Sequence, residues 1–156
     1  MKTFIYSILT MVVVCCSFSA CSSDDDADRT YTHTTTPEQE AQGVYRGTFT
    51  RAQANVSDAV REEGDGTLTI SPTDTAYVAH VRFECTALGI AAETKVNITF
   101  ANDGFLFSND LASNTLGSPI TGRISTDHDA RSDFQLKIRQ GRSTKTFDIV
   151  FSGKAE

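Results

Sequence analysis

The sequence has no tryptophan, only three prolines and only four cysteines, and the placement of the cysteines removes one class of fold. Cys15, Cys16 and Cys21 lie close to the N-terminus, so Cys85 is the only cysteine beyond residue 21. A small scaffold held together by disulfide bonds is therefore excluded, because it needs several paired cysteines in its folded part. Cys85 lies in an apolar stretch, where a lone cysteine usually behaves as a small buried hydrophobic side chain.

A long hydrophobic run is also missing. The apolar segment of residues 4–14 is interrupted by Ser7 and Thr10. It is shorter than the roughly 20 residues that cross a membrane as a helix. Lys2 precedes the segment, and small residues and then acids follow it. A short apolar segment between a cation and small residues is typical of a secretory signal peptide. We predict such a signal over residues 1–20.

The end of this segment carries a processing motif. Phe18, Ser19 and Ala20 precede Cys21, and the four residues together resemble a bacterial lipobox. The resemblance implies that Cys21 is the first mature residue and carries a diacylglyceryl membrane anchor, which two acyl chains make stable. The tract SSDDD, residues 22–26, resembles the one that follows the lipidated cysteine in surface lipoproteins of the Bacteroides group. It implies an outer-membrane lipoprotein exposed at the cell surface. A periplasm-facing lipoprotein with a plain acidic linker is the alternative.

The chain has no surplus of positive charge, which argues against a nucleic-acid partner. Its formal net charge is −6, and much of the excess acid lies between residues 21 and 42. That segment is polar and threonine-rich and contains Pro37, so it cannot bury enough apolar surface to fold by itself. We predict a flexible tether over residues 21–42 and one folded domain over residues 43–156.

The rest of the chain consists mainly of short β-forming runs separated by turn residues. In most runs apolar residues alternate with polar ones, as they do at Phe134, Leu136 and Ile138. This period of two is typical of strands that are buried on one face. Turn residues such as Asp65-Gly66 separate the runs. The predicted strands are 43–51, 66–71, 76–85, 94–100, 104–108, 118–125, 133–140 and 145–153.

Eight consecutive antiparallel strands leave two exposed edges unless the sheet closes. We therefore predict an all-β fold, a single eight-stranded up-and-down antiparallel barrel, with a two-sheet β-sandwich as the alternative. Residues 52–64 interrupt the strand pattern and are predicted to form a short helix that ends at Gly64. This helix, or a flap in its place, would cover one mouth of the barrel. The side chains expected to line the interior are Tyr45, Phe49, Ile70, Val81, Phe83, Ile98, Phe107, Phe134 and Phe151.

The first predicted strand also carries a family resemblance. Its sequence GVYRGTFT, residues 43–50, resembles the opening strand of calycin-like, or lipocalin-like, β-barrel lipoproteins of the Bacteroides group. The resemblance implies a lipocalin-like barrel over residues 43–156. In that barrel Tyr45 takes the place of the tryptophan that plugs the closed end of lipocalins.

No set of residues with a specific catalytic chemistry stands out. Asp127, His128 and Asp129 carry groups that bind metal ions or orient a base. A zinc site needs three or four converging ligands, however, and adjacent loop residues rarely converge on one ion. We interpret these three residues as a polar turn between two strands. We therefore predict no catalytic residue, no metal site and no cofactor.

One basic stretch lies near the C-terminus. Lys137 and Arg139 alternate with apolar residues on one predicted strand, and Arg142 and Lys145 follow in the turn and the next strand. Such a cluster either meets an anionic glycan, lipid head group or protein, or protects a strand edge from pairing with another chain.

From these patterns we expect a non-enzymatic, lipid-anchored binding module with no nucleic-acid partner. Its barrel interior either holds a small apolar ligand or is filled by phenylalanine side chains. The alternative is an accessory or inhibitor protein at the cell surface that binds a macromolecule, a surface protein or a glycan, through its loops.

Overall fold

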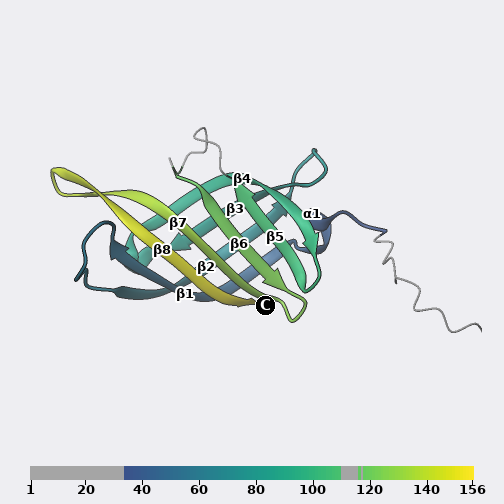
Figure 1. Cartoon of the computed structure of the whole chain (residues 1–156), viewed down its shortest axis with the longest axis horizontal. Coiled ribbons are helices and arrows are strands. Elements are labelled where there is room, and N and C mark those ends of the chain that lie inside the picture. The colour runs from purple at the N-terminus through teal and green to yellow at the C-terminus, as the bar shows by residue number, and fades with distance from the viewer. Residues whose placement is uncertain (1–33, 110–115, 117) are drawn as a thin grey trace, which may run out of the picture. The chain divides into compact units, whose positions relative to one another are not determined.

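A computed structural model describes residues 34–109, 116 and 118–156. The predicted signal peptide, Cys21 and the predicted tether up to residue 33 lie outside these residues. Strands form nearly all of the regular structure (Figure 1). The elements in chain order are α1 (Pro37–Glu40), β1 (Gly43–Gln53), β2 (Glu62–Pro72), β3 (Val78–Cys85), the 3-10 helix η1 (Thr86–Leu88), β4 (Ile90–Ala101), β5 (Gly104–Asn109), β6 (Ile120–Ser125), β7 (Asp129–Gln140) and β8 (Ser143–Ala155).

The eight strands form one antiparallel up-and-down sheet that closes into a barrel. Each strand pairs with the next along the chain, and β1 also pairs with β8, so the order around the ring follows the sequence. Closure leaves no strand of the ring with a free edge along its whole length. The predicted eight-stranded barrel is confirmed, and each predicted strand overlaps an observed one.

The alternation of apolar and polar residues explains which face of the sheet turns inward. Along β3, for example, Val81, Phe83 and Cys85 are buried, whereas Arg82 and Glu84 between them are exposed. All nine side chains predicted to face the interior are at most 5% exposed and belong to one hydrophobic cluster. The period of two therefore located the core correctly.

Phenylalanine rings occupy the middle of this core. The ring centroids of Phe49 and Phe151 lie 4.8 Å apart, and those of Phe83 and Phe134 lie 4.5 Å apart. Phe49 and Phe83 join the two pairs with an edge-to-face contact at 6.3 Å. These separations lie within the range of favourable aromatic contacts. Rings from β1, β3, β7 and β8 thus pack against one another across the interior.

A row of glycines lies where the ring closes. Gly47 on β1 is directly opposite Gly66 on β2 and Gly153 on β8. A Cβ atom on any of the three would lie 2.1 to 2.5 Å from a carbonyl oxygen of a neighbouring strand. Because no real Cβ approaches an oxygen so closely, only glycine fits at this level of the wall. Glycine at such positions lets a sheet bend sharply, and here it accommodates the curvature across β8, β1 and β2.

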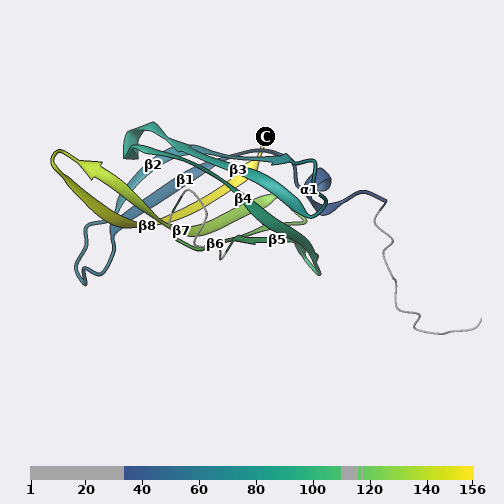
Figure 2. The ribbon, with the colours of Figure 1, turned by 90° about the horizontal axis from the view of Figure 1, so that it is seen from above.

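The connections between strands alternate between the two ends of the barrel. Topology and Figures 1 and 2 place α1 and the β2–β3, β4–β5 and β6–β7 connections at one end, which we call the helix end. The β1–β2 connection, η1 and the β7–β8 turn lie at the other end, which we call the ribbon end.

At the helix end, the last residues of the predicted tether, 21–42, belong to the folded unit. Glu38 of α1 is 3% exposed and Ala41 is 1% exposed. The Tyr45 hydroxyl donates a hydrogen bond of 2.8 Å to the Ala41 carbonyl, and the Tyr77 amide donates one of 3.0 Å to the Glu38 carboxylate. The folded part therefore begins before Gly43, because a buried carboxylate and a tyrosine hydroxyl fix α1 to the barrel.

The predicted helix over residues 52–64 is wrong. β1 continues to Gln53 and β2 already begins at Glu62, so only a connection of turns remains between them. Arg51 and Glu62 are paired directly across the two strands, which extends the ladder into the segment expected to be helical. Strand pairing thus overrides the local helical preference. The two valines that would have covered the barrel mouth face solvent instead, with Val56 45% and Val60 81% exposed.

Candidate functional site

The β7–β8 hairpin extends beyond the barrel wall. β6 pairs with β7 only as far as Phe134, and β1 pairs with β8 from Phe147 onward. Past these residues β7 and β8 continue as a two-stranded ladder, from the pair Lys137 and Thr146 to the turn. Figure 1 shows this hairpin, in green and yellow, projecting from the ribbon end. We call residues 136–146 the basic ribbon.

All four cations predicted to form a basic patch lie on this ribbon. Lys137, Arg139, Arg142 and Lys145 are each exposed, and residues 136–146 contain no acid. The ion pairs found among the described residues involve none of the four. The prediction from sequence thus placed the cations together, and the structure adds that they stand on a projecting ribbon.

The turn at the tip holds the ribbon in a defined shape. Gly141 has a φ of 61°, a conformation that glycine adopts without strain and that short hairpin turns require. Arg139 Nε donates to the Gly141 carbonyl at 3.3 Å, and the Ser143 hydroxyl donates to the Gln140 carbonyl at 3.2 Å. The cations are therefore presented on an ordered ladder rather than on a loose loop.

The β1–β2 connection is a second exposed feature of the ribbon end. An open groove of about 450 Å³ runs between this connection and Asp148 of β8, and Arg61 contributes to its lining. Val56 also lines the groove, and Val60 lies in the same connection and faces solvent. The ribbon end therefore combines a fifth cation with two exposed apolar side chains.

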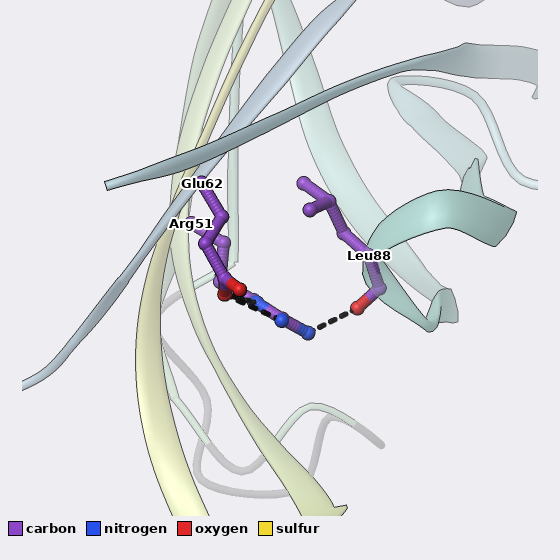
Figure 3. A network of polar contacts seen from close by, with 3 residues as sticks. All are labelled: Arg51, Glu62 and Leu88. Atoms are coloured by element: carbon purple, nitrogen blue, oxygen red, sulfur yellow. Dashed lines mark hydrogen bonds and ion pairs between the residues drawn. The ribbon is translucent and has the colours of Figure 1, made fainter. Parts of the chain in front are cut away.

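Arg51 closes the barrel interior beneath these loops. It is 9% exposed, and its Nε and Nη2 atoms donate to the Glu62 carboxylate at 2.9 and 2.5 Å. Its Nη1 atom donates to the backbone carbonyl of Leu88 in η1, and Figure 3 shows the three residues together. The guanidinium carbon also lies 4.9 Å from the centroid of the Phe147 ring. A single cation thus joins β1, β2, η1 and β8.

Sequence reasoning missed Arg51. The residue continues the inward series of Tyr45, Gly47 and Phe49 at the same spacing of two, so the pattern itself could have identified it. Its partner Glu62 could not have been found in this way, because the register of β1 against β2 is not visible in the sequence. We interpret Arg51 as a structural plug, since all its polar contacts are made within the fold.

The buried groups of the helix end have altered acid–base properties. Burial raises the pKa of the Glu38 carboxyl, but the Thr36 hydroxyl and the backbone amides of Glu38 and Tyr77 outweigh it, so the pKa lies below its ordinary value. Burial raises the pKa of the Tyr45 hydroxyl above its ordinary value. Glu38 is therefore a carboxylate at neutral pH, and Tyr45 remains a hydrogen-bond donor. Both groups hold α1 in place, and their chemistry is structural.

The remaining chemically interesting residues lie apart. Asp127 and His128 lie in the β6–β7 turn, and Asp129 is the first residue of β7. His128 has a φ of 61°, and its amide donates to the Ser125 carbonyl. Cys85 is a buried free thiol, as predicted. Among residues 34–109, 116 and 118–156, no group of three or more histidine, cysteine or acidic residues is arranged to hold a metal ion. In the same part of the chain no helix is long and apolar enough to cross a membrane.

The fold and these surfaces define an eight-stranded up-and-down β-barrel with a basic ribbon at one end. Comparison with protein-family models, with curated proteins and with solved structures found no match.

Proposed function

We propose that the protein is a non-enzymatic, lipid-anchored binding module that engages an acidic polysaccharide through the basic ribbon. The observation that carries the proposal is the presence of four exposed cations on the basic ribbon, three on its two-stranded ladder and Arg142 in its turn, with no acid among residues 136–146. Cations without nearby acids keep their full attraction for an anionic partner.

The residue types on the ribbon favour a polysaccharide over a folded protein as the partner. Protein interfaces usually rely on buried aromatic, methionine or arginine anchors in pockets. The ribbon contains no aromatic residue and no methionine, and its only apolar side chains are those of Leu136 and Ile138. Its two arginines are exposed rather than buried in pockets. Lys137 and Arg139 share one face of β7, so their Cα atoms lie about 7 Å apart along the strand. Such regular spacing suits a polymer with repeated negative charges.

The packed interior gives less support to a small apolar ligand. Such a ligand would need space among the inward side chains, and sites for small molecules usually measure several hundred cubic ångströms. In this barrel Phe49, Phe83, Phe134 and Phe151 contact one another across the middle. This packing favours a binding surface on the outside of the barrel.

The proposed anchor is the diacylated Cys21, which would hold the barrel at the outer face of the outer membrane. The expected consequence is simple to test in cells. Replacing Cys21 with alanine should move the protein from the membrane fraction to the soluble fraction, because the variant lacks the two acyl chains that would insert into the bilayer. A Cys21→Ala protein that stays firmly in the membrane fraction would refute the anchor.

The binding proposal is tested with dextran sulfate as the acidic probe and uncharged dextran as its control. The wild-type full-length chain, purified in an uncharged detergent, should bind dextran sulfate and show no measurable binding to uncharged dextran. Each exposed ion pair contributes about 0.2 to 1 kcal/mol, so the double variant Lys137→Gln and Arg139→Gln should bind roughly 2- to 30-fold more weakly. Binding of the wild type should also weaken as salt is added.

A matched control removes the same charge from another part of the barrel wall. The double variant Arg82→Gln and Lys95→Gln changes outer residues of β3 and β4, and it should bind dextran sulfate within about twofold of wild type. Equal losses in the two double variants would show that binding follows net charge alone. That result would contradict a specific role for the ribbon.

A further inference from the structure

Charged side chains that face each other across neighbouring strands are mostly of opposite sign in this barrel. The directly opposed pairs of opposite sign are Arg51–Glu62, Arg82–Glu93 and Lys154–Asp129. Two pairs in the ladders of the described residues carry like charges, counting histidine as neutral: Arg46 opposite Lys154, and Arg123 opposite Arg131. Like charges in this position, with Cβ atoms about 5 Å apart, destabilise a sheet. The folded protein therefore retains two unfavourable pairs.

Both like-charge pairs line the same groove on the outer wall. The groove has a volume of about 580 Å³ and spans β1, β6, β7 and β8. Arg46 and Lys154 contribute from one side, and Arg123 and Arg131 contribute from the other. The other residues that line the groove are Ser125, Asp129, Ala130, Ser152 and Gly153. Two repulsive pairs thus converge on one open space that is large enough for a sugar-sized ligand.

Two of the arginines keep their terminal nitrogens for another partner. Arg46 bonds to Glu156 through Nε, and Arg131 lies 4.0 Å from Asp133, also through Nε. Neither acid lines the groove. The Nη1 and Nη2 atoms of both guanidinium groups remain to make the forked, bidentate contact with an oxyanion that arginine is suited to.

The other two cations are also only partly neutralised. Arg123 contacts Asp103 through one terminal nitrogen at 3.2 Å, and Asp103 lies outside the groove lining. Lys154 lies 3.8 Å from Asp129, which is the one acid among the lining residues. The lining therefore carries four cations and one carboxylate, and the acids paired with the three arginines lie outside it, so an anion in the groove would face mainly cationic groups.

We propose that this groove binds a tetrahedral oxyanion, a sulfate or phosphate group, carried by a small sugar-sized molecule. A dianion placed between the two like-charge pairs converts their repulsion into attraction. A tetrahedral group also offers oxygens in several directions, which matches cations that arrive from β1, β6, β7 and β8, and the Ser125 and Ser152 hydroxyls are further donors beside them. The site is separate from the basic ribbon and does not depend on the function proposed for it.

Binding is measured by calorimetry and by thermal unfolding of the full-length chain in an uncharged detergent. The probes are sodium sulfate, sodium phosphate, glucose 6-sulfate and sodium glucuronate, with sodium chloride at matched ionic strength as the reference. Sulfate, phosphate and glucose 6-sulfate should bind saturably and raise the unfolding temperature above the chloride reference. Tighter binding of glucose 6-sulfate than of sulfate identifies a sugar ester as the ligand, and equal binding identifies the free anion. Tighter binding of glucuronate than of glucose 6-sulfate would overturn the tetrahedral assignment.

The variants separate this site from a general effect of charge. Arg131→Gln and Arg123→Gln should each weaken binding of glucose 6-sulfate at least about tenfold, which corresponds to losing one hydrogen bond to a charged group. Without ligand, Arg123→Gln removes the repulsion from Arg131 together with the exposed ion pair to Asp103, so its unfolding temperature should lie within about 4 °C of that of wild type. Arg82→Gln, outside the groove, should leave the affinity unchanged and should not raise the unfolding temperature, because it removes an ion pair with Glu84 rather than a like-charge pair. Unchanged affinity in both groove variants, or the same temperature rise with chloride alone, would overturn the proposal.

Discussion

The Arg51 plug yields the most quantitative prediction. Methionine at this position keeps a long apolar stem but removes every polar contact of the guanidinium. The hydrogen bond to the Leu88 carbonyl involves a charged donor, and such bonds contribute about 1.5–3 kcal/mol. The position over the Phe147 ring adds about 0.5–1 kcal/mol.

The ion pair with Glu62 should add little to this sum. The Glu62 side chain is 49% exposed, so water can solvate it once Arg51 is gone, and its pairing contributes about 0–1 kcal/mol. The contacts share one guanidinium group and are not independent. We therefore expect Arg51→Met to lower the free energy of unfolding by about 2–4 kcal/mol.

Chemical denaturation followed by far-UV circular dichroism measures this loss, since the chain has no tryptophan to report on unfolding. The matched control is Arg82→Met, which breaks an ion pair with Glu84 whose side chains are both about half exposed. The control should cost at most about 0.5 kcal/mol. If Arg51→Met falls within that same margin of wild type, the guanidinium does not hold the ribbon end together, and the interpretation of Arg51 as a plug is wrong.

Three further predictions concern the helix end and the packed interior. Tyr45→Phe removes the donor to a buried carbonyl and should cost about 1–3 kcal/mol of unfolding free energy, whereas Tyr77→Phe, at an exposed ring, should be neutral. Glu38→Gln should destabilise the protein at pH 7. Because the pKa of Glu38 is lowered on folding, its carboxylate contributes to the free energy of unfolding above pH 4.5, and this contribution is lost in acid. The stability curves of the wild type and the variant should therefore converge as the pH falls below 4.5. A difference that stays constant as the pH falls below 4.5 would contradict this assignment. In Gly122→Ala the new Cβ would lie 2.1 Å from Cζ of Phe107, so unfolding measurements should show a loss of about 1–3 kcal/mol, and adding Phe107→Leu should recover part of it.

The core could be read from the sequence because it depends on one local rule. Alternation at positions such as Leu68 and Ile70, or Val96 and Ile98, requires only that each strand buries one face. The same alternation does not predict the residues at which a strand begins and ends. Residues 52–64 contain good helix formers, yet β1 and β2 extend into this segment, because their ladder forms long-range bonds that a single sequence does not reveal.

The candidate sites depend on register, which explains why they were only partly predictable. The four cations of the ribbon are close in sequence, so their clustering was visible in advance. The groove is different, since Arg46 and Lys154 are more than one hundred residues apart and Arg123 faces Arg131 only in one alignment of β6 and β7. The docking of α1 was missed for a related reason: Glu38 finds its partner in the backbone of a distant turn.

Because the β7–β8 hairpin projects beyond the ring, its tip can change in length and sequence independently of the barrel. The register of the ring is fixed by ladders that end at Phe134 and Phe147, and nothing in those ladders depends on how far the hairpin continues. Inserting or deleting one residue in each strand near the tip changes its reach by about 3.4 Å and leaves the barrel untouched. Homologues with identical barrels can therefore carry tips of different length and charge, and a foreign peptide spliced in place of Gly141 should be displayed without unfolding its carrier.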